Sequence, residues 1–512
     1  MRSFAPGFSA LTAAVVCLSC VAATPATYGP RKVDIPVSDG RPPKKGETEG
    51  AARQSPPTSG AAKQSPFPAV ARAKLANGMS VAVVSSKTLP IVQLRLVVRA
   101  GSGFGPSPAV ATLTGDMLKD GGTRAMSSAE LLRRVETLGS DLSVSTDFDA
   151  TVIAMPVIKD QLPEALSLLS QVVREPRFDG EELKKLKARS ADAAEDAARS
   201  SGGFTATRTI FKELFPEKSA YATFGNTPAE IAKVDGNAVR EFHRRFYVPK
   251  ATTLVLAGDV DEPTAKALAE RHFGAWQGGE PPKVAAPGPK LPPKMRVVVA
   301  HRPKSVQSDV YVAMLAPPRK APGWAQVRVA NQILGGGVAS RLFMDVREQR
   351  SLAYRTSAQV LELASGEQPL VAYAGTQTEK TGQAIQGLLE NLAKMTTSPP
   401  TQAETEAARR YLSDIFAVRM ETIGSIADMV VTQETFGLPD GYWDAYRREI
   451  RATEPDAALA AAKALYTPDR ALVVVAGDAD VIGPELAKLG DVTVVDPEKE
   501  FATLKTIPKA ER

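Results

Sequence analysis

The spacing of apolar residues along the chain predicts both strands and helices. Residues 71–86 alternate apolar and polar positions on both sides of Asn77-Gly78, which favours a hairpin with a type I′ turn. A continuous apolar run at 91–102 predicts a buried strand, and 141–157 predicts two more strands. Helical periodicity follows in three stretches, 127–140, 159–176 and 180–200. This order predicts an α+β fold in which helices pack on a largely antiparallel sheet.

An internal repeat divides the chain into two homologous halves. The stretch FYVPKATTLVLAGDVD at 246–261 matches LYTPDRALVVVAGDAD at 465–480, at a constant offset of 219 residues. A looser echo, offset by about 211 residues, places 133–145 over 344–357. We therefore interpret the chain as two homologous halves joined by a Pro-rich linker and followed by a short tail. The predicted bounds are 69–277 and 295–500 for the halves, 278–294 for the linker and 501–512 for the tail.

The first residues have the pattern of an export signal. One basic residue precedes an apolar run and then small residues, which predicts a signal peptide at 1–23. Alternatively the signal ends before Cys20, and Cys20 becomes the lipidated first residue of a lipoprotein. Residues 24–68 are rich in Pro, Gly, Ser and Lys, which predicts a disordered tether. We expect an exported protein, either periplasmic or anchored to the outer membrane.

Composition and charge narrow the range of partners. The chain has 512 residues and a formal charge of only +6, and many of its basic residues lie in Pro-rich segments. No basic stripe with interleaved aromatic residues is present, which argues against a nucleic-acid partner. Beyond the first residues no stretch reaches the apolar length of a membrane-spanning helix, so membrane attachment is expected only through a lipid anchor. Both cysteines, Cys17 and Cys20, lie in the predicted signal, so the mature domain has no thiolate ligand.

Several longer stretches resemble one enzyme family. They include LANGMSVAVV, QILGGGVASRLFMDVREQRSLAYRTS and METIGSIADMVVTQETFGLPDGYW, and they run in order from Leu75 to Asp478. The chain resembles the insulinase-type (pitrilysin-like) zinc peptidases, in the bacterial branch that is similar to mitochondrial processing peptidases. The resemblance implies an α+β clamshell of two homologous halves, each with a largely antiparallel sheet covered by helices.

The resemblance also shows what this chain lacks. In active members an H-x-x-E-H motif supplies two zinc ligands and the general base, and it falls on the stretch AVATLTGDMLKDGGT. The two ligand positions correspond to Thr112 and Asp116, the base position to Gly115, and the distant third ligand to Ala193 or, with a slip of one, to Asp192. All of these positions have changed, so the resemblance implies that this chain binds no zinc of its own.

Other residues could in principle rebuild a metal site. Asp116 and Asp120 lie four residues apart and could contact one divalent ion, although solvated acidic residues on a helix explain them more simply. The three histidines, His243, His272 and His301, show no ligand spacing. We therefore predict no metal or other cofactor in this chain.

The second half retains two residues that matter in active members. The motif V-R-E-x-R-x-L-A-Y supplies an arginine and a tyrosine that hold substrate and stabilise the oxyanion, and here these positions are Arg347 and Tyr354. A surface ion pair and a half-buried tyrosine are the simpler alternative. Gly335, Gly336 and Gly337 form either a substrate-contacting loop, as the resemblance implies, or a helix stop with a tight turn.

Three functions follow, in order of preference. The first is a non-catalytic, substrate-binding subunit that pairs with a zinc-bearing paralogue and completes its active site in trans. The partners would then be that paralogue, in a heterodimer whose zinc lies in the paralogue, and a peptide or unfolded polypeptide substrate. The second is a peptide-binding or scaffold protein of the cell envelope with no part in catalysis. A metallopeptidase that acts alone comes last.

Overall fold

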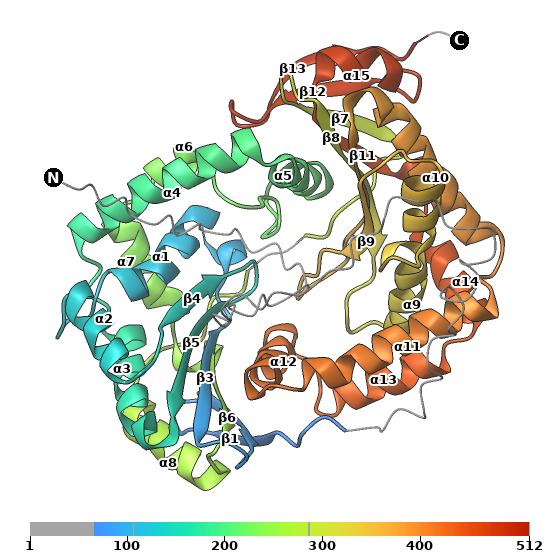
Figure 1. The fold of residues 1–512 in the computed structure, drawn as a ribbon. Helices are drawn as coiled ribbons and strands as arrows, with labels where there is room; N and C mark the ends of the chain where they lie inside the picture. The colour runs from blue at the N-terminus through green and yellow to red at the C-terminus, as the bar shows by residue number, and fades with distance from the viewer. Residues whose placement is uncertain (1–65, 106, 285–286, 511–512) are drawn as a thin grey trace, which may run out of the picture. The chain divides into compact units, whose positions relative to one another are not determined.

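The computed structural model describes residues 66–105, 107–284 and 287–510, and it contains two β-sheets with their helices (Figure 1). The predicted signal peptide, the lipidation of Cys20 and nearly all of the predicted tether lie outside the described residues. No helix in the described part of the chain combines the length and apolar character needed to cross a bilayer.

The first half is built on a six-stranded sheet with the strand order β1-β2-β6-β3-β5-β4. The strands are β1 (Ala71–Lys74), β2 (Ser80–Ser85), β3 (Ile91–Val98), β4 (Ser143–Thr146), β5 (Thr151–Ile158) and β6 (Thr252–Gly258). Only β2 and β6 pair in parallel; the other neighbours are antiparallel. The largely antiparallel sheet that the sequence predicts is therefore confirmed for this half.

The hairpin predicted around Asn77-Gly78 forms, but its turn type is wrong. Lys74 pairs with Ser80, so the connection has five residues, Leu75–Met79, rather than two. Gly78 has a positive φ of 92°, whereas Asn77 does not, and a type I′ turn requires both. The side chain of Asn77 instead donates a hydrogen bond to the carbonyl oxygen of Phe273 (2.8 Å), so this loop is shaped by a tertiary contact.

Eight helices accompany this sheet in the described residues. They are α1 (Pro108–Asp120), α2 (Ser128–Thr137), α3 (Leu162–Arg174), α4 (Gly180–Ser200), α5 (Gly202–Leu214), α6 (Pro228–Ala232), α7 (Gly236–Phe246) and α8 (Glu262–Phe273). Short 3₁₀ turns lie at η1 (Ser102–Phe104), η2 (Lys159–Gln161) and η3 (Pro249–Ala251). The core of this half lies between one face of the sheet and the apolar sides of α1, α3, α7 and α8.

The second half has a seven-stranded sheet with the order β13-β12-β7-β11-β8-β10-β9. Its strands are β7 (Arg296–His301), β8 (Gln307–Ala316), β9 (Arg355–Val360), β10 (Gln368–Gln377), β11 (Leu472–Gly477), β12 (Val492–Asp496) and β13 (Ala502–Ile507). Its helices are α9 (Trp324–Gly335), α10 (Thr381–Thr397), α11 (Gln402–Arg419), α12 (Ile423–Phe436), α13 (Tyr442–Ala452), α14 (Pro455–Leu465) and α15 (Ala479–Leu486). A π-helical segment, η4 (Phe343–Gln349), precedes β9, and 3₁₀ turns lie at η5 (Thr378–Lys380) and η6 (Pro468–Arg470).

The topology confirms that the two halves are homologous. The order β2-β6-β3-β5-β4 in the first sheet corresponds strand by strand to β7-β11-β8-β10-β9 in the second. The two matched sequence copies form β6 and β11, each after a helix. The predicted end of the second half at residue 500 is wrong, because β13 pairs with β12 and so extends the sheet to Ile507.

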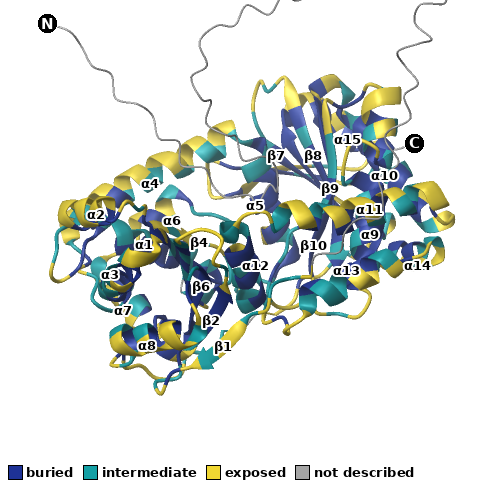
Figure 2. Cartoon of the chain, turned by 60° about the horizontal axis from the view of Figure 1, so that its bottom comes forward, coloured by how far each residue is buried: buried dark blue, intermediate teal, exposed yellow. Residues whose placement is uncertain are grey.

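One helix of each half packs on the sheet of the other half. Helix α5 of the first half packs on β7, β8 and β11, and α12 of the second half packs on β3 and β6. Ile210 and Phe211 of α5 are fully buried there, as is Val430 of α12. Every residue of the central strands β6 and β11 is accordingly buried, and β6 is dark blue in Figure 2.

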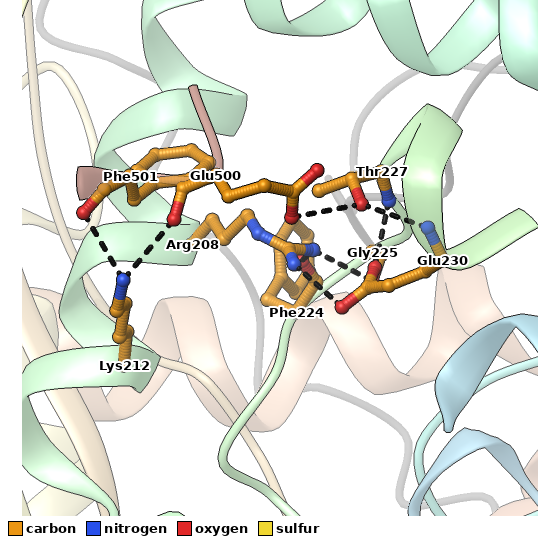
Figure 3. A network of polar contacts seen from close by, with 8 residues as sticks. All are labelled: Arg208, Lys212, Phe224, Gly225, Thr227, Glu230, Glu500 and Phe501. Atoms are coloured by element: carbon orange, nitrogen blue, oxygen red, sulfur yellow. Dashed lines mark hydrogen bonds and ion pairs between the residues drawn. The ribbon is translucent and has the colours of Figure 1, made fainter. Parts of the chain in front are cut away.

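Polar contacts within the first half and between the two halves surround α5 (Figure 3). The guanidinium of Arg208 pairs with Glu230 at 3.0 Å, donates to the carbonyl oxygens of Phe224 and Gly225, and lies over the ring of Phe501. The neighbouring Lys212 donates to the carbonyl oxygens of Glu500 and Phe501. The two contacts of Lys212 join the turn between β12 and β13 to the first half.

The chain just before β1 crosses to the second half. The ring of Phe67 contacts Phe416 and Trp443, with ring centroids 6.5 and 6.3 Å away, and its backbone N–H donates to Asp444. Arg72 continues this contact through ion pairs with Glu434 and Asp440. The predicted tether, which ends at residue 68, therefore ends too late, because Phe67 is already packed.

The linker predicted at 278–294 follows the surface of the first half where it is described. The backbone N–H of Lys290 donates to the carbonyl oxygen of Leu214 at the end of α5 (2.8 Å). The hydroxyl of Ser219 donates to the carbonyl oxygen of Pro287, also at 2.8 Å. The Pro-rich stretch is thus held against the fold at these two points.

Candidate functional site

Helix α1 carries three of the four positions that correspond to the zinc site. Ala109, Leu113 and Met117 lie on its buried face and pack into the core of the first half. The hydroxyl of Thr112 donates to the carbonyl oxygen of Pro108 one turn earlier, at 3.0 Å. Its single hydroxyl donor is therefore used within the helix.

Gly115, at the position of the general base, has no space for a side chain. An ideal Cβ placed there would lie 2.4 Å from Oγ1 of Thr146 on β4 and 3.5 Å from Cγ2 of Thr151. The hydroxyl of Thr146 is fixed by a hydrogen bond of 3.1 Å to that of Thr151, which donates in turn to the carbonyl oxygen of Ala100. Because a hydrogen-bond chain holds the hydroxyl of Thr146 in place, a glutamate at 115 requires this side chain to be displaced.

The acidic residues of α1 do not converge on a metal site. Burial, and after it the negative charge of Asp120, raises the pKa of Asp116 to about 6. Asp120 is paired with Arg189 of α4 at 2.5 Å. Ala193 and Asp192, the candidates for the third ligand position, are exposed on α4. In the described part of the chain no group of three metal-ligating side chains involves α1 or α4.

A different group of potential ligands lies in the second half, where the sequence offered no ligand spacing. Donor atoms of His301, Asp478 and Asp480 lie within 4.8 Å of one another. However, Nδ1 of His301 accepts a hydrogen bond from the backbone N–H of Ala479 (3.1 Å). Because Nδ1 is the acceptor, the neutral ring carries its proton on Nε2, which faces Asp480 at 3.9 Å. Neither ring nitrogen is then available to a metal.

The carboxylates in this group have structural partners as well. Asp478 caps α15 through the backbone N–H of Asp480 and also accepts from that of Lys304 (2.7 Å). The side chain of Asp480 is bound by Lys505 at 2.6 Å, and that hydrogen bond holds the pKa of Asp480 below its ordinary value. These contacts identify the group as a helix cap.

The other two histidines are parts of the first half's framework. Nε2 of His243 lies 2.8 Å from the carbonyl oxygen of Val173, and its ring stacks on Tyr247. Burial lowers the pKa of His243 to about 4, so the ring is neutral and donates to that carbonyl. His272 contributes its backbone carbonyl oxygen to Ser170 and Arg174.

Arg347 lies on the solvent-exposed side of the π-helical segment η4. Its guanidinium stacks over the ring of Phe343 with the charge 4.5 Å from the ring centroid, and Glu348 lies 3.6 Å away. A cation held over an aromatic ring by a single loose ion pair keeps donors available for another group. The structure thus presents Arg347 as a side chain open to solvent.

Tyr354 is exposed at the start of β9, with 51% of its surface accessible. Its backbone N–H donates to the carbonyl oxygen of Gly375. Its ring packs against the same glycine, where a Cβ would lie only 2.7 Å from Cζ of Tyr354. The adjacent Tyr373 donates to Asp309 at 2.7 Å. Within the described residues no hydrogen bond joins Arg347 and Tyr354, so the structure exposes both without linking them.

The three consecutive glycines have different surroundings. A Cβ at Gly335 would lie 2.3 Å from the backbone nitrogen of Ala358, and one at Gly336 would meet the side chain of Gln332 at 2.2 Å. Gly337 is exposed and begins the tip that carries Val338. Close packing of α9 against β9 explains Gly335, and the side chain of Gln332 on the same helix explains Gly336, so only the third glycine lies in an open loop.

Comparisons with known proteins agree with this arrangement. The family profile described as "Insulinase (Peptidase family M16)" matches residues 80–202, and that described as "Peptidase M16 inactive domain" matches residues 233–412. Together the two profiles cover more than half of the chain; the first lies within the first half, and the second runs from the end of the first half into the second. The chain belongs to the insulinase (M16) peptidase family.

Two curated relatives of this M16 protein come from Helicobacter pylori. One, named "Non-peptidase homolog YmxG", is 24% identical over 69% of this chain and 81% of its own length. The other, named "Zinc protease PqqE", is 23% identical over 72% of this chain and 84% of its own length. A crystal structure described as a peptidase M16 inactive domain from Pseudomonas fluorescens aligns with a TM-score of 0.74 at 25% identity, over 80% of this chain and 98% of that one.

No sequence pattern predicted the contacts that explain positions 115 and 354. Thr146 and Gly375, which decide what fits at 115 and where Tyr354 lies, belong to no motif. A glycine in the middle of an amphipathic helix was the one local sign of a close approach at 115. Nothing local marks Gly375 within its apolar strand.

Proposed function

We propose that this protein is a non-catalytic, substrate-binding subunit of a peptidase whose zinc is held by a second chain of the same family. One contrast carries the proposal. Thr146 occupies the space beside Gly115 that a general base would need, whereas Arg347 and Tyr354 of the other half are intact and exposed. A chain that has lost one part of a composite site and kept the other fits a partner that supplies the missing part.

The two retained side chains suit one task. Peptide hydrolysis passes through a tetrahedral intermediate whose oxyanion is stabilised by hydrogen-bond donors placed in advance. The guanidinium of Arg347 and the phenol of Tyr354 are such donors. Among the described residues Arg347 has one long ion pair and a ring contact, and Tyr354 is exposed. In the proposed complex they would bind the substrate carbonyl in trans, while the partner binds zinc and activates water.

The relatives support a division of labour between two chains. Helicobacter pylori has one relative named as a zinc protease and one named as a non-peptidase homologue, so both kinds of chain occur in a single organism. We further propose that the protein is exported and works in the cell envelope, on the basis of its first residues.

The test is reconstitution with a paralogue that contains H-x-x-E-H. The mixture should form a heterodimer and hydrolyse an unfolded polypeptide, while this chain alone should not. Arg347→Ala and Tyr354→Phe should each lower kcat about 10-fold or more without weakening the heterodimer. Arg244→Ala, which removes an exposed arginine of α7 paired only with Glu241, is the matched control and should keep the full rate. Undiminished hydrolysis by the double variant Arg347→Ala/Tyr354→Phe would refute the assigned role.

A second function is a peptide-binding or scaffold protein of the envelope. It is favoured by β4, an edge strand of the first sheet whose outer side has no neighbouring strand among the described residues. Such an edge can accept an extended peptide as an additional strand. A neighbouring reading frame with H-x-x-E-H supports the first function, and its absence supports the second. One tightly bound zinc per purified chain would overturn both and indicate a peptidase that acts alone.

A further inference from the structure

The phenol of Tyr354 lies beside a second phenol, that of Tyr373 on β10. The two groups meet over Gly375, where an ideal Cβ would lie 2.8 Å from the hydroxyl oxygen of Tyr354 and 2.7 Å from that of Tyr373. Tyr373 and Gly375 are two residues apart on one strand, so they face the same side of the sheet. Glycine at 375 therefore leaves the space in which the two hydroxyl groups become neighbours.

Tyr373 is held by several contacts, unlike the exposed Tyr354. It is buried, and its ring packs on that of Tyr311 with the centroids 4.9 Å apart. Its hydroxyl donates to Oδ1 of Asp309 at 2.7 Å. Burial, and after it the negative charge of Asp309, raises the pKa of Tyr373, so the hydroxyl keeps its proton and this hydrogen bond. Tyr373 is thus a fixed neighbour of an exposed ring.

The other carboxylate oxygen of Asp309 lies against the first half. A Cβ at Gly202, the first residue of α5, would lie 2.0 Å from Oδ2 of Asp309. The partial positive charge at the N-terminal end of a helix favours a carboxylate in this place. The neighbouring Gly203 has more space, since the nearest tertiary contact of its Cβ would be the hydroxyl oxygen of Tyr311 at 3.4 Å. A continuous set of contacts therefore leads from α5 of the first half to the two tyrosines.

We propose that Tyr373 is a positioning residue for Tyr354, held in place by Asp309 and, through Asp309, by α5 of the first half. A donor to an oxyanion is effective only when it is placed in advance, and a displacement of about 1 Å can lower a rate about 100-fold. The fixed hydroxyl of Tyr373 limits where the exposed ring of Tyr354 can lie over Gly375. The first half, which has lost the zinc positions, thereby still contributes to the site. The inference rests on the proposed function for the role of Tyr354, whereas the contacts among these residues do not depend on it.

Kinetics of the reconstituted heterodimer test this role. Tyr373→Phe, which keeps the ring and removes the hydroxyl, should lower kcat about 10-fold and leave KM unchanged. In the Tyr354→Phe background the same substitution should have no further effect on kcat, because Tyr373 acts through Tyr354. Asp309→Asn, which retains an acceptor oxygen for Tyr373, should keep more of the rate than Asp309→Ala. Tyr411→Phe, at an exposed tyrosine of α11, is the matched control and should keep the full rate.

Two neighbouring glycines test the contribution of the first half. Gly202→Ala places a methyl group on Oδ2 of Asp309 and should lower kcat about as much as Tyr373→Phe. Gly203→Ala makes the same change one residue later, where the added methyl group fits, and should keep most of the rate. Equal rates in the two alanine variants would contradict a contribution from α5.

Fluorine NMR of the free chain labelled with fluorotyrosine tests the contacts without a partner. The resonance of Tyr354 is assigned by its loss in Tyr354→Phe. It should shift in Tyr373→Phe and Gly202→Ala. It should stay in place in the controls Tyr411→Phe and Gly203→Ala.

Two outcomes would overturn the proposal. One is a Tyr354 resonance that does not respond to Tyr373→Phe, and the other is a further loss of kcat when Tyr373→Phe is added to Tyr354→Phe. Failure of the proposed function is distinguishable. In that case Tyr354→Phe leaves kcat undiminished, while the resonance of Tyr354 in the free chain still responds to Tyr373→Phe, so the positioning stands and its use in hydrolysis does not.

Discussion

The hydroxyl of Thr146 occupies the space beside Gly115 in which any side chain at that position would begin, 2.4 Å from an ideal Cβ. Helix α1 packs on β4 at this glycine, and the hydroxyl of Thr146 is held in place by its hydrogen bond to Thr151 of β5. The packing of α1 against β4 therefore disfavours a general base at position 115. Restoring H-x-x-E-H by substitution alone should not restore a zinc site.

The cost of a side chain at 115 can be measured. Gly115→Ala should lower the free energy of unfolding by about 1–3 kcal/mol in urea denaturation, because the added methyl group overlaps a fixed neighbour. Thr146→Ala should relieve most of that loss in the double variant, which identifies the overlap as the cause. Gly180→Ala is the control: it lies in the first turn of α4 with no atom within 4 Å of its Cβ, so it should be neutral or slightly stabilising. A stable Gly115→Ala protein would contradict the packing argument.

The outline of each half was predictable because it depends on local signals and on the repeat. Strand alternation and helical periodicity specify β4, β5, α3 and α4, and the repeated stretch specifies β6 and β11. The exchange of α5 and α12 between the sheets was not predictable, because an apolar helix face does not encode which of two apolar sheets will cover it. For the same reason the partners of Gly115 and Tyr354, which are distant in sequence, emerged only from the fold.

Arg208 should be a sensitive polar residue of α5, the first-half helix that packs on the second sheet. Its side chain is only 7% exposed, and Arg208→Ala leaves the carboxylate of Glu230 partly buried without its partner. We expect a loss of about 3 kcal/mol in the free energy of unfolding, as for other broken buried pairs. The double variant Arg208→Ala/Glu230→Ala should lose less than the sum of the two single variants.

The matched control for Arg208 is an exposed pair on the preceding helix. Arg199→Ala removes an ion pair with Glu195 and a longer one with Glu498 at 4.0 Å. All three side chains are more than half exposed, so we expect a loss of no more than about 0.5 kcal/mol. Equal losses in Arg208→Ala and Arg199→Ala would show that the Arg208–Glu230 pair in Figure 3 contributes no more than an exposed pair.

Phe67 should stabilise the second half although it precedes the first strand of the first half. Phe67→Ala removes a ring that contacts Phe416 and Trp443 and should cost about 2 kcal/mol, less than a fully buried phenylalanine. The tryptophan fluorescence of the folded protein should shift as well, because Trp443 loses a neighbour. Leu89→Ala, at a position that is 59% exposed, should change neither quantity.

Asp116 should make the protein less stable as the pH rises. Burial and Asp120 raise its pKa in the folded protein to about 6, above the ordinary 3.8, so the folded state binds more protons than the unfolded state between these values. The free energy of unfolding therefore decreases as pH rises from about 4 through 6. Asp116→Asn removes this dependence and should raise stability at pH 8 by up to about 3 kcal/mol, with little effect at pH 4. Urea unfolding of both proteins across this range measures the difference, with the exposed Asp192→Asn as control. If Asp116→Asn is less stable than the wild type at pH 8, the carboxylate of Asp116 has a favourable partner. That result would support a cation bound at α1.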